Sequence, residues 1–403
     1  MDMVSTESFS FHKYANSSFE GCVNQSSCSQ WQQYEEREDQ GLLALRISIS
    51  IVYSLVCAVG LVGNVLVLHL LRTGKHTQKS SINLFVFNLA VTDFLFVLVL
   101  PFWAVEMALD FSWPFGLVMC KIIPSLTVLN AYTSVFFLTS MSVTRYCSVA
   151  TALKPPAHIQ RLCTARWISS LIWLVACLAT VPTAVFTTLD SVGDDQACLL
   201  RLPRNGFWLA MYHLQKIVLG FLIPLAIIII CYLLLLHFLK QQHLNYIHPE
   251  RQNKVTKSVM IVVLSFFICW LPNHVITFWG VLVKLLEVDD TAYNIVHEYI
   301  FPVTICLAHT NSCLNPLIYC LMRKEFRKAL KTLFWRLSAS PFSNSCLASV
   351  GFSVESEGAQ VAIPLNPMES HSQQAFQSYT KRSLLPSSTA TTVHKNSTPV
   401  VVC

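Results

Sequence analysis

Charged residues are scarce in this sequence. They occupy 12% of 403 positions, whereas hydrophobic residues occupy 53%. A soluble domain ordinarily carries about 25% charged residues. So few charges cannot cover the surface of a water-soluble protein of this length, and the apolar residues gather in long blocks that a soluble core does not need. The composition therefore predicts an integral membrane protein.

Motifs of the common enzyme classes are also missing. The sequence has no phosphate-binding loop, dinucleotide fingerprint or zinc-protease motif. Its His and Cys residues lack the close spacing of metal ligands. We therefore expect no catalytic residues and no cofactor, apart from the ion considered below. His297 and His309 are expected to be helix-interior or pocket side chains.

Seven apolar blocks each reach the roughly 20 residues that a helix needs to cross a bilayer. In lipid the backbone N–H and C=O groups must be paired within the segment, so each block is predicted to be α-helical. The expected fold class is all-α, a seven-transmembrane helix bundle. The blocks are residues 47–71, 84–109, 122–149, 167–186, 207–239, 259–283 and 295–321.

Basic residues predict the orientation of these spans. They cluster at 72–79, 161–166, 251–257 and 323–331, all on one side of the predicted membrane. The positive-inside rule makes that side cytoplasmic. Residues 1–14 lack the apolar stretch of a signal peptide. We expect a multi-pass protein of the plasma membrane with an extracellular N-terminus and a cytoplasmic C-terminus. The net charge of +6 reflects topology and does not indicate nucleic-acid binding.

The regions outside the bundle differ in composition. Phe326, Leu330 and Leu337 fall at helical spacing with basic residues opposite, as in a helix lying on a membrane surface. Sequons at Asn16 and Asn24 predict glycosylation. The expected organisation is an extracellular disordered segment at 1–40, the bundle at 41–321, a short amphipathic membrane-surface helix at 322–337 and a disordered, Ser/Thr-rich cytoplasmic tail at 338–403.

The predicted outer side carries many acids and four cysteines. The acids can be solvated loop charges, or they can form a field that attracts a cationic ligand. The four cysteines, an even number facing an oxidising compartment, predict disulfides without fixing their pairing. The cysteines are Cys22, Cys28, Cys120 and Cys198, and the acids include Glu106, Asp110, Asp190 and Asp290.

One carboxylate, Asp93, lies inside an apolar span among Leu and Phe residues. A charge there is costly without a partner, so it invites a functional interpretation. Nearby hydroxyl and amide oxygens can complete a shell for a small hard cation such as sodium. Alternatively, Asn64, Asp93 and Asn315 are interhelical hydrogen-bonding groups. Both interpretations can hold together.

An ordered set of residues, one group per span, resembles the rhodopsin-like G-protein-coupled receptors over about residues 45–337. Each motif alone is weak, but the full set at these spacings is specific. The motifs are Gly63-Asn64, residues 88–93 ending in Asp93, Cys120 with Arg145-Tyr146, Trp173, Pro224 with Tyr232, Phe266 with residues 269–272, and residues 315–319.

The resemblance implies roles for these residues. Cys120 and Cys198 are expected to form a disulfide. A sodium ion is expected at Asp93 with Asn130, Ser134, Asn311, Ser312 and Asn315. The activation switch and G-protein contact are expected at Arg145, Tyr146, Tyr232, Phe266, Trp270, Pro272, Asn315, Pro316 and Tyr319. Expected partners are an inhibitory-class G protein, and arrestin through the phosphorylated tail. Thr144 departs from the pattern, because most members carry an acid before this arginine.

The resemblance also narrows the ligand. Amine receptors carry an aspartate where Thr127 stands, and opsins carry a retinal-bearing lysine where His309 stands. Residues 100–116, 213–221, 269–284 and 301–316 resemble the receptors for relaxin-3 and insulin-like peptide 5. A basic peptide hormone is then the expected ligand. Alternatives are a chemokine or angiotensin-type peptide and, outside the receptors, a transporter.

Trp103, Glu106 and Asp110 carry the most specific part of this likeness. Their spacing of three and four residues places all three on one face of a helix end. Two carboxylates can then hold peptide arginines beside an aromatic platform. The alternative is an interfacial tryptophan with solvated acids. The full expected ligand set is Trp103, Glu106, Asp110, Thr127, Lys216, Trp270, His274 and His309.

Overall fold

The structure is a computed structural model. It describes residues 25–73, 80–150, 158–192, 195–203, 205–241, 249–286, 288, 290–322, 327 and 331. The chain divides into two compact units, Met1–Arg336 and Leu337–Cys403, and every described residue belongs to the first.

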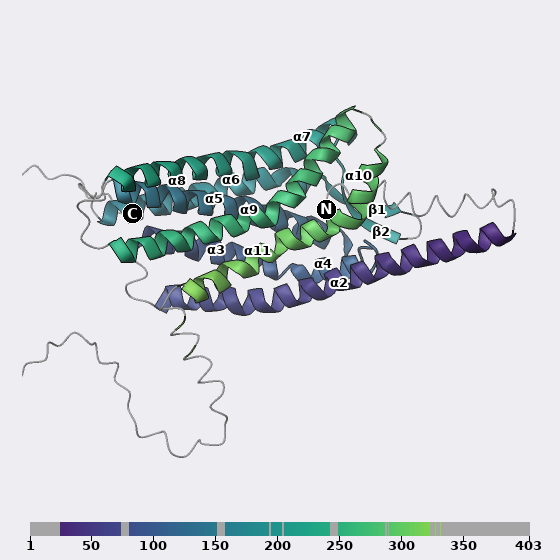
Figure 1. Ribbon diagram of the computed structural model, residues 1–403, viewed down its shortest axis with the longest axis horizontal. Helices are drawn as coiled ribbons and strands as arrows, with labels where there is room; N and C mark the ends of the chain where they lie inside the picture. Colours follow the sequence, from purple (N-terminus) through teal and green to yellow (C-terminus); the bar gives the residue numbers. More distant parts are fainter. Residues whose placement is uncertain are drawn as a thin grey trace, which may run out of the picture. The chain divides into compact units, whose positions relative to one another are not determined.

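Long helices lying side by side make up the first unit (Figure 1). The contacts between α9 and α11, α5 and α6, α3 and α5, and α2 and both α4 and α11 join them into one bundle. The helices are α2 Gln25–Thr73, α3 Ser81–Val97, α4 Leu100–Ala108, α5 Gly116–Ala150, α6 His158–Phe186, α7 Asn205–Ile217, η3 Val218–Leu222, α8 Ile223–Gln241, α9 Pro249–Leu286, α10 Thr291–Ile295, η4 Val296–Ile300 and α11 Phe301–Met322.

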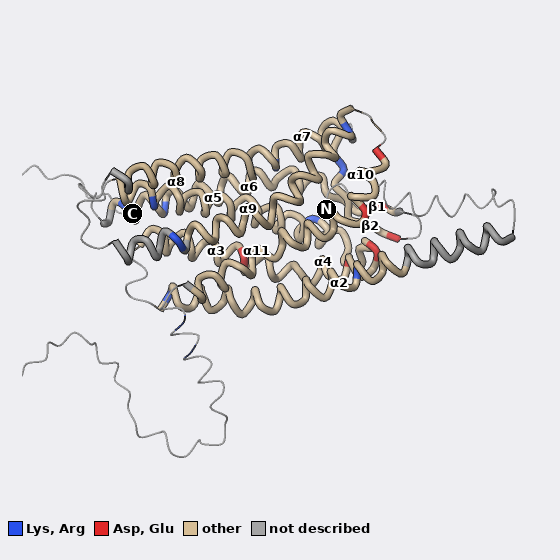
Figure 2. The backbone as a smooth tube through the Cα atoms, viewed as in Figure 1, with Lys and Arg blue, Asp and Glu red and all other residues tan. Residues whose placement is uncertain are grey.

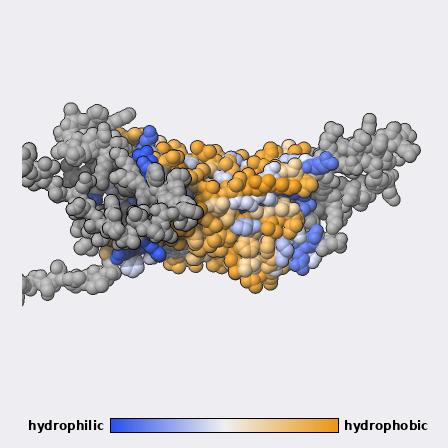
Figure 3. Space-filling model, turned by 90° about the horizontal axis from the view of Figure 1, so that it is seen from below, coloured by the Kyte–Doolittle hydropathy of each residue, from blue (hydrophilic) through white to orange (hydrophobic). Residues whose placement is uncertain are grey.

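Six described helical segments are long and apolar enough to cross a membrane, and a seventh helix, α11, completes the predicted set. α11 has 22 residues and contains the polar side chains of His309, Asn311 and Asn315. The bundle surface carries a broad apolar belt with hydrophilic residues toward both ends (Figure 3). The seven-helix expectation is confirmed.

Prolines interrupt the helices at specific places. Pro101 has no N–H to offer the carbonyl of Val97, and the second span breaks there between α3 and α4. The thiol of Cys57 in α2 donates to that carbonyl oxygen at 3.2 Å. Pro224 follows the π-helical turn η3, whereas Pro272 and Pro316 lie inside continuous helices. The break at Pro101 was not predicted.

A β-hairpin follows α6. Strands β1 Thr187–Val192 and β2 Asp195–Leu200 pair antiparallel, with Leu189 opposite Cys198. A disulfide joins Cys198 to Cys120 in α5, as the receptor resemblance implies. The backbone N–H of Trp113 donates to the carbonyl of Gln196 at 2.7 Å. The all-α expectation missed this hairpin. We call the end of the bundle that carries β1 and β2 the hairpin end.

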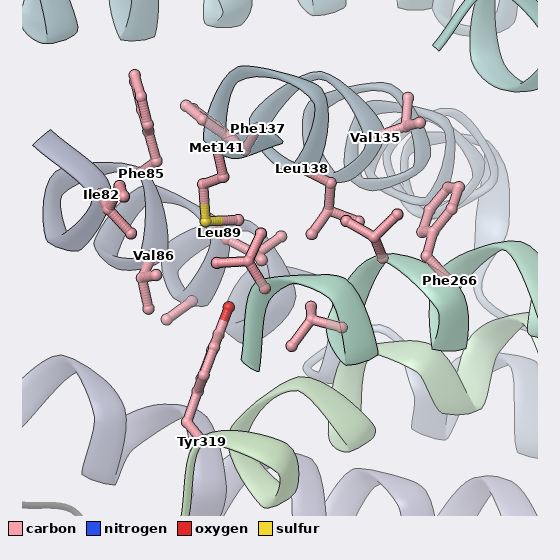
Figure 4. Close-up of a cluster of buried hydrophobic side chains, with 14 of the residues drawn as sticks. Ile82, Phe85, Val86, Leu89, Val135, Phe137, Leu138, Met141, Phe266 and Tyr319 are labelled. Atoms are coloured by element: carbon pink, nitrogen blue, oxygen red, sulfur yellow. The ribbon is translucent and has the colours of Figure 1, made fainter. Parts of the chain in front are cut away.

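The core in the other half of the bundle is apolar. Side chains from α3, α5, α9 and α11 point into one space, among them Leu89, Met141, Phe266 and Tyr319 (Figure 4). Close helix contact nearby depends on Gly63, because a Cβ there would lie 2.8 Å from the ring of Pro316. The sequence predicted these spans but not this contact.

Two predictions about the flanking regions have different outcomes. The disordered segment at 1–40 is wrong from Gln25 onward, where α2 begins. Gln, Glu and Arg are good helix formers, and no proline interrupts residues 25–40. Most of the surface helix at 322–337, the tail, the sequons at Asn16 and Asn24, and the side chains of Cys22 and Cys28 lie outside the described residues. Arg327 and Lys331 are helical and exposed.

Candidate functional site

Acidic residues of the described chain gather at the hairpin end, on α4, β1, β2 and around α10 (Figure 2). Some are already paired. Asp190 pairs with Arg201. Asp290 caps the N-terminus of α10 by accepting from Tyr293 N, and it also accepts from the indole of Trp279 at 3.0 Å. These two acids therefore have structural partners within the hairpin end.

Trp103 and Glu106 lie on α4 and are almost fully buried, with 3% and 4% of their surface exposed. The indole Nε1 of Trp103 donates to the hydroxyl of Thr127 in α5 at 3.1 Å, which fixes the ring. The rings of Trp103 and Trp113 lie 6.0 Å apart. Two expected ligand residues, Trp103 and Thr127, thus meet between α4 and α5, and Glu106 lies one turn further along α4. The indole is packed within the bundle.

Asp110 departs from the predicted helical face. α4 ends at Ala108, and Asp110 and Phe111 follow with φ of 54° and 62°. The Asp110 side chain is 56% exposed, and its carboxylate pairs with Arg46 of α2 at 2.9 Å. The expectation that Trp103, Glu106 and Asp110 share one helix face is therefore wrong for Asp110, because the helix does not continue to it.

His309 of α11 lies among aromatic rings from three other helices. Its ring centroid is 5.0 Å from that of Phe96, 5.6 Å from that of Tyr53 and 6.5 Å from that of Trp103. The Tyr53 hydroxyl and His309 Nδ1 are buried without a hydrogen-bond partner among the described residues. The structure therefore brings His309 to Trp103, as a shared ligand region requires.

Lys216 and His274 lie on the other side of the bundle, on α7 and α9. The Lys216 ammonium lies 5.3 Å from the centroid of the Tyr212 ring. His274 is stacked on Trp270, with ring centroids 5.8 Å apart, and packs against Phe221 at 4.8 Å. The expected ligand residues thus form two groups, one around Trp103 and one around His274.

Asp93 is the centre of a buried polar cluster. Its two carboxylate oxygens accept hydrogen bonds from Asn130 Nδ2 at 3.1 Å and Asn315 Nδ2 at 2.8 Å. Ser312 donates to Asn130 Oδ1 at 3.5 Å. Asn64, the other group predicted to join helices, donates to the carbonyls of Gly60 and Ser312. The predicted cluster therefore joins α2, α3, α5 and α11.

Two further members of the predicted ion site, Ser134 and Asn311, are buried within the bundle. The oxygens Asn311 Oδ1 and Asn315 Oδ1 accept no hydrogen bond from the described residues. These are hard oxygen acceptors of the type that sodium prefers. No group of three His, Cys, Asp or Glu residues that could hold a metal ion occurs in the described part of the chain. At Asp93 the groups that could bind an ion are one carboxylate and the amide oxygens of the neighbouring asparagines.

The expected switch residues lie toward the end of the bundle opposite the hairpin. Arg145 and Tyr146 are half-buried near the end of α5. Phe266 is buried and stacks on Trp270 with centroids 5.8 Å apart, and Tyr319 is buried in the apolar core. Tyr232 packs against the same core. The stack of Phe266, Trp270 and His274 links this core to the hairpin half.

Sequence reasoning missed Arg46, Tyr53 and Phe111. Arg46 did carry a signal, because it is a lone basic residue at the start of the first span, on the side predicted to be acidic. Tyr53 and Phe111 carried none, because one aromatic residue within or beside an apolar span is ordinary.

Comparison with known proteins identifies the family. The profile of the "7 transmembrane receptor (rhodopsin family)" matches residues 63–319. Relaxin-3 receptor 1 of Homo sapiens is 49% identical over 358 residues, which is 79% of this chain and 76% of the relative. Relaxin-3 receptor 2 of Homo sapiens is 48% identical, with 72% and 77% covered. Type-2 angiotensin II receptor of Homo sapiens is 36% identical, with 71% and 79% covered.

Both parts of the sequence resemblance, to the rhodopsin-like receptors and to the relaxin-3 receptors, are confirmed by these matches. The prediction that the chain is no enzyme is confirmed too, because the family consists of receptors. The chain is a multi-pass membrane protein and belongs to the rhodopsin-like, or class A, G-protein-coupled receptors.

Proposed function

We propose that this protein is a plasma-membrane receptor for a peptide of the relaxin family, of the relaxin-3 or insulin-like peptide 5 type. The hairpin end then faces the outside of the cell and the opposite end faces the cytoplasm. The names of the relatives at 48–49% identity support this ligand class. The clustering of basic residues in the loops supports the orientation.

The observation that carries the proposal is the buried Glu106 beside Trp103 at the hairpin end. A carboxylate removed from water gains more from a guanidinium partner than an exposed one does. The adjacent indole adds a face on which that guanidinium can lie. An arginine of a basic peptide has the matching charge and shape, whereas a neutral or acidic ligand does not.

Lys216 and His274 are proposed as the second half of the peptide site. Lys216 can meet a carboxylate or a backbone carbonyl of the peptide. His274 stacks on Trp270, and Trp270 stacks on Phe266, so a ligand that presses on His274 acts on the stack that leads into the core. Binding at the hairpin end and a change of helix position at the opposite end are then coupled through α9, which can bend at Pro272.

At the cytoplasmic end we propose activation of an inhibitory-class G protein, which lowers cyclic AMP. Arg145 is half-buried near the inner end of α5, where its guanidinium can bind helix C-terminal carbonyls of a partner. The phosphorylated tail at 338–403 is proposed to recruit arrestin, because phosphate groups create sites for basic side chains.

The test is a cyclic-AMP assay on cells that express the receptor. Forskolin-raised cyclic AMP should fall on adding relaxin-3 or insulin-like peptide 5, and pertussis toxin should abolish that fall. Angiotensin II and a chemokine panel serve as comparison ligands. A response that is confined to angiotensin II would favour the second candidate, an angiotensin-type receptor, which the 36% identical relative supports. The absence of any peptide response would overturn the proposal.

We further propose a sodium ion at Asp93. Asn130, Ser134, Asn311, Ser312 and Asn315 would supply the neighbouring oxygens. The fit rests on one buried carboxylate and on amide oxygens that accept no hydrogen bond from the described residues. A bound sodium ion would hold α3, α5 and α11 together and thereby favour one arrangement of the bundle. A transporter is disfavoured, because the family whose profile matches consists of receptors.

A further inference from the structure

Asp110 is already occupied by a guanidinium of the protein itself. Arg46 Nη2 lies 2.9 Å from Asp110 Oδ1, and the two side chains are 20% and 56% exposed. Arg46 is therefore the better shielded partner, and the carboxylate presents its free side to water. A peptide arginine that approaches Asp110 meets an acid whose charge is partly neutralised.

The position of Arg46 is fixed by its backbone. Ser50 Oγ lies 3.0 Å from the carbonyl oxygen of Arg46 and 2.8 Å from that of Ala104, and it can donate to either. This contact joins α2 to α4 one turn from Arg46. The backbone of Arg46 is therefore held beside α4, from where its guanidinium reaches Asp110.

The Asp110 turn, residues 109–111, has a strained backbone. Two consecutive residues with side chains adopt the left-handed region, which residues other than glycine rarely occupy. The N–H of Phe111 donates to the carbonyl of Glu106 at 2.8 Å, and the N–H of Ser112 donates to that of Leu109 at 3.0 Å. Such strain persists only where surrounding contacts hold it.

Phe111 supplies one of those contacts. Its ring packs against the cluster of α2 and α4 that includes Trp103, and also against the cluster of Ile276, Phe301 and Ile305 in α9 and α11. The side chain therefore bridges the two sides of the bundle at the hairpin end. The ion pair of Asp110 with Arg46 supplies the other contact, from α2.

We propose that Arg46 is a specificity-determining residue that competes with the ligand's arginine for Asp110 and holds the Asp110 turn closed until that arginine displaces it. This inference rests on the proposed function. A ligand without a cationic side chain cannot replace Arg46 on Asp110, so the turn with Phe111 stays across the bundle. A ligand with one takes over the carboxylate and releases Arg46 into water.

The first test uses Arg46→Gln with radiolabelled relaxin-3 on membranes. Removing an exposed competing ion pair should raise the affinity by about two- to fivefold. The gain should disappear in an Asp110→Asn background, because the competition no longer exists there. Arg201→Gln is the matched control, since it also removes an arginine from an ion pair with an aspartate at the hairpin end. It should leave the affinity unchanged.

Three outcomes would overturn the proposal. A lower affinity in Arg46→Gln would make Arg46 a ligand contact. An unchanged affinity would remove the competition. An equal gain of affinity in Arg201→Gln would mean that the affinity depends only on the total positive charge at the hairpin end.

The second test needs no ligand and so separates this inference from the proposed function. Hydrogen–deuterium exchange is measured on the full-length receptor in lipid nanodiscs. The amides of residues 111 and 112 should exchange faster in Arg46→Gln than in the wild type, while those of α5 stay unchanged. If the amides of residues 111 and 112 exchange at the same rate in Arg46→Gln and in the wild type, Arg46 does not hold the turn. If exchange rises but no relaxin-family peptide binds the wild type, the inference about the turn stands and the proposed ligand falls.

Discussion

The polar cluster at Asp93 and the acidic site at the hairpin end are held in opposite ways. Asp93 is fully buried, and both its oxygens accept side-chain hydrogen bonds from other helices. Asp110 is more than half exposed, lies on a strained turn and has one exchangeable partner. The hydrogen bonds of Asp93 therefore favour a fixed arrangement of helices at the centre of the bundle. The ion pair of Asp110, by contrast, is exposed enough for a binding partner to replace Arg46.

Glu106 lies between these extremes. It is as buried as the Asp93 group, yet it belongs to the short helix α4 at the hairpin end, next to the strained turn. A ligand that opens this end would reach a carboxylate already removed from water.

Breaking the hairpin end altogether should have the largest effect. Cys120→Ser or Cys198→Ser removes the disulfide between α5 and β2. Loss of such a bond typically costs about 2–5 kcal/mol of stability. We expect loss of surface expression or of peptide binding, measured by flow cytometry and radioligand binding. The double variant should be no worse than either single variant, because one bond is lost in all three. Additive losses would contradict the pairing.

Neutralising Glu106 and Asp110 in turn should separate the contribution of a buried carboxylate to peptide affinity from that of an exposed one. Glu106→Gln should weaken an arginine-bearing relaxin peptide by about 2–5 kcal/mol, because a peptide arginine is left buried without its partner. Asp110→Asn should cost at most about 1 kcal/mol, since the site is exposed and the ion pair with Arg46 is lost with it. Competition binding at equal surface expression gives both values. A larger loss from Asp110→Asn than from Glu106→Gln would reverse the assignment.

Changing the fixed cluster should alter regulation and spare the peptide site. In the wild type, replacing choline by sodium should lower agonist affinity by about fivefold or more, if the ion favours the inactive arrangement. Asp93→Asn should abolish that dependence, because the ion loses its only carboxylate. Agonist binding in the two salts provides the measurement. A wild-type sodium dependence in the variant would exclude an ion at Asp93.

The smallest effect is expected at the opposite end. Thr144→Asp restores an acid next to Arg145 and should lower basal G-protein activation by about two- to fivefold, the range of an exposed ion pair. Thr144→Asn is the matched control without charge and should leave basal activation unchanged. Basal nucleotide exchange on purified G protein measures both. Equal basal rates in all three proteins would mean that the missing acid is compensated elsewhere.

The same contrast explains which features the sequence could predict. The seven spans follow from the length and apolarity of the blocks, and the contacts of Asp93 with Asn130 and Asn315 follow from family positions in continuous helices. The Asp110 turn could not be predicted, because its backbone depends on contacts of Phe111 with α9 and α11 that are distant in sequence. The spacing of Trp103, Glu106 and Asp110 predicts a common face only if the helix reaches Asp110, whereas α4 ends at Ala108.

The hairpin and the start of α2 were missed for related reasons. Strands β1 and β2 have six residues each and are positioned by the Cys120–Cys198 bond and by the contact of Trp113 N with Gln196. Residues 25–40 are polar and mixed in charge, a composition shared by disordered segments and by exposed helices. Composition alone could not separate these two states.

The central claim is that the hairpin end binds a relaxin-family peptide while the opposite end activates a G protein. The most direct test measures peptide affinity and G-protein nucleotide exchange in the same membranes for Glu106→Gln and Arg145→Ala. Glu106→Gln should lower the affinity, and exchange should recover at saturating peptide. Arg145→Ala should leave the affinity within about threefold and abolish exchange at every peptide concentration. A loss of affinity in Arg145→Ala equal to that in Glu106→Gln, or full exchange in Arg145→Ala, would contradict the central claim.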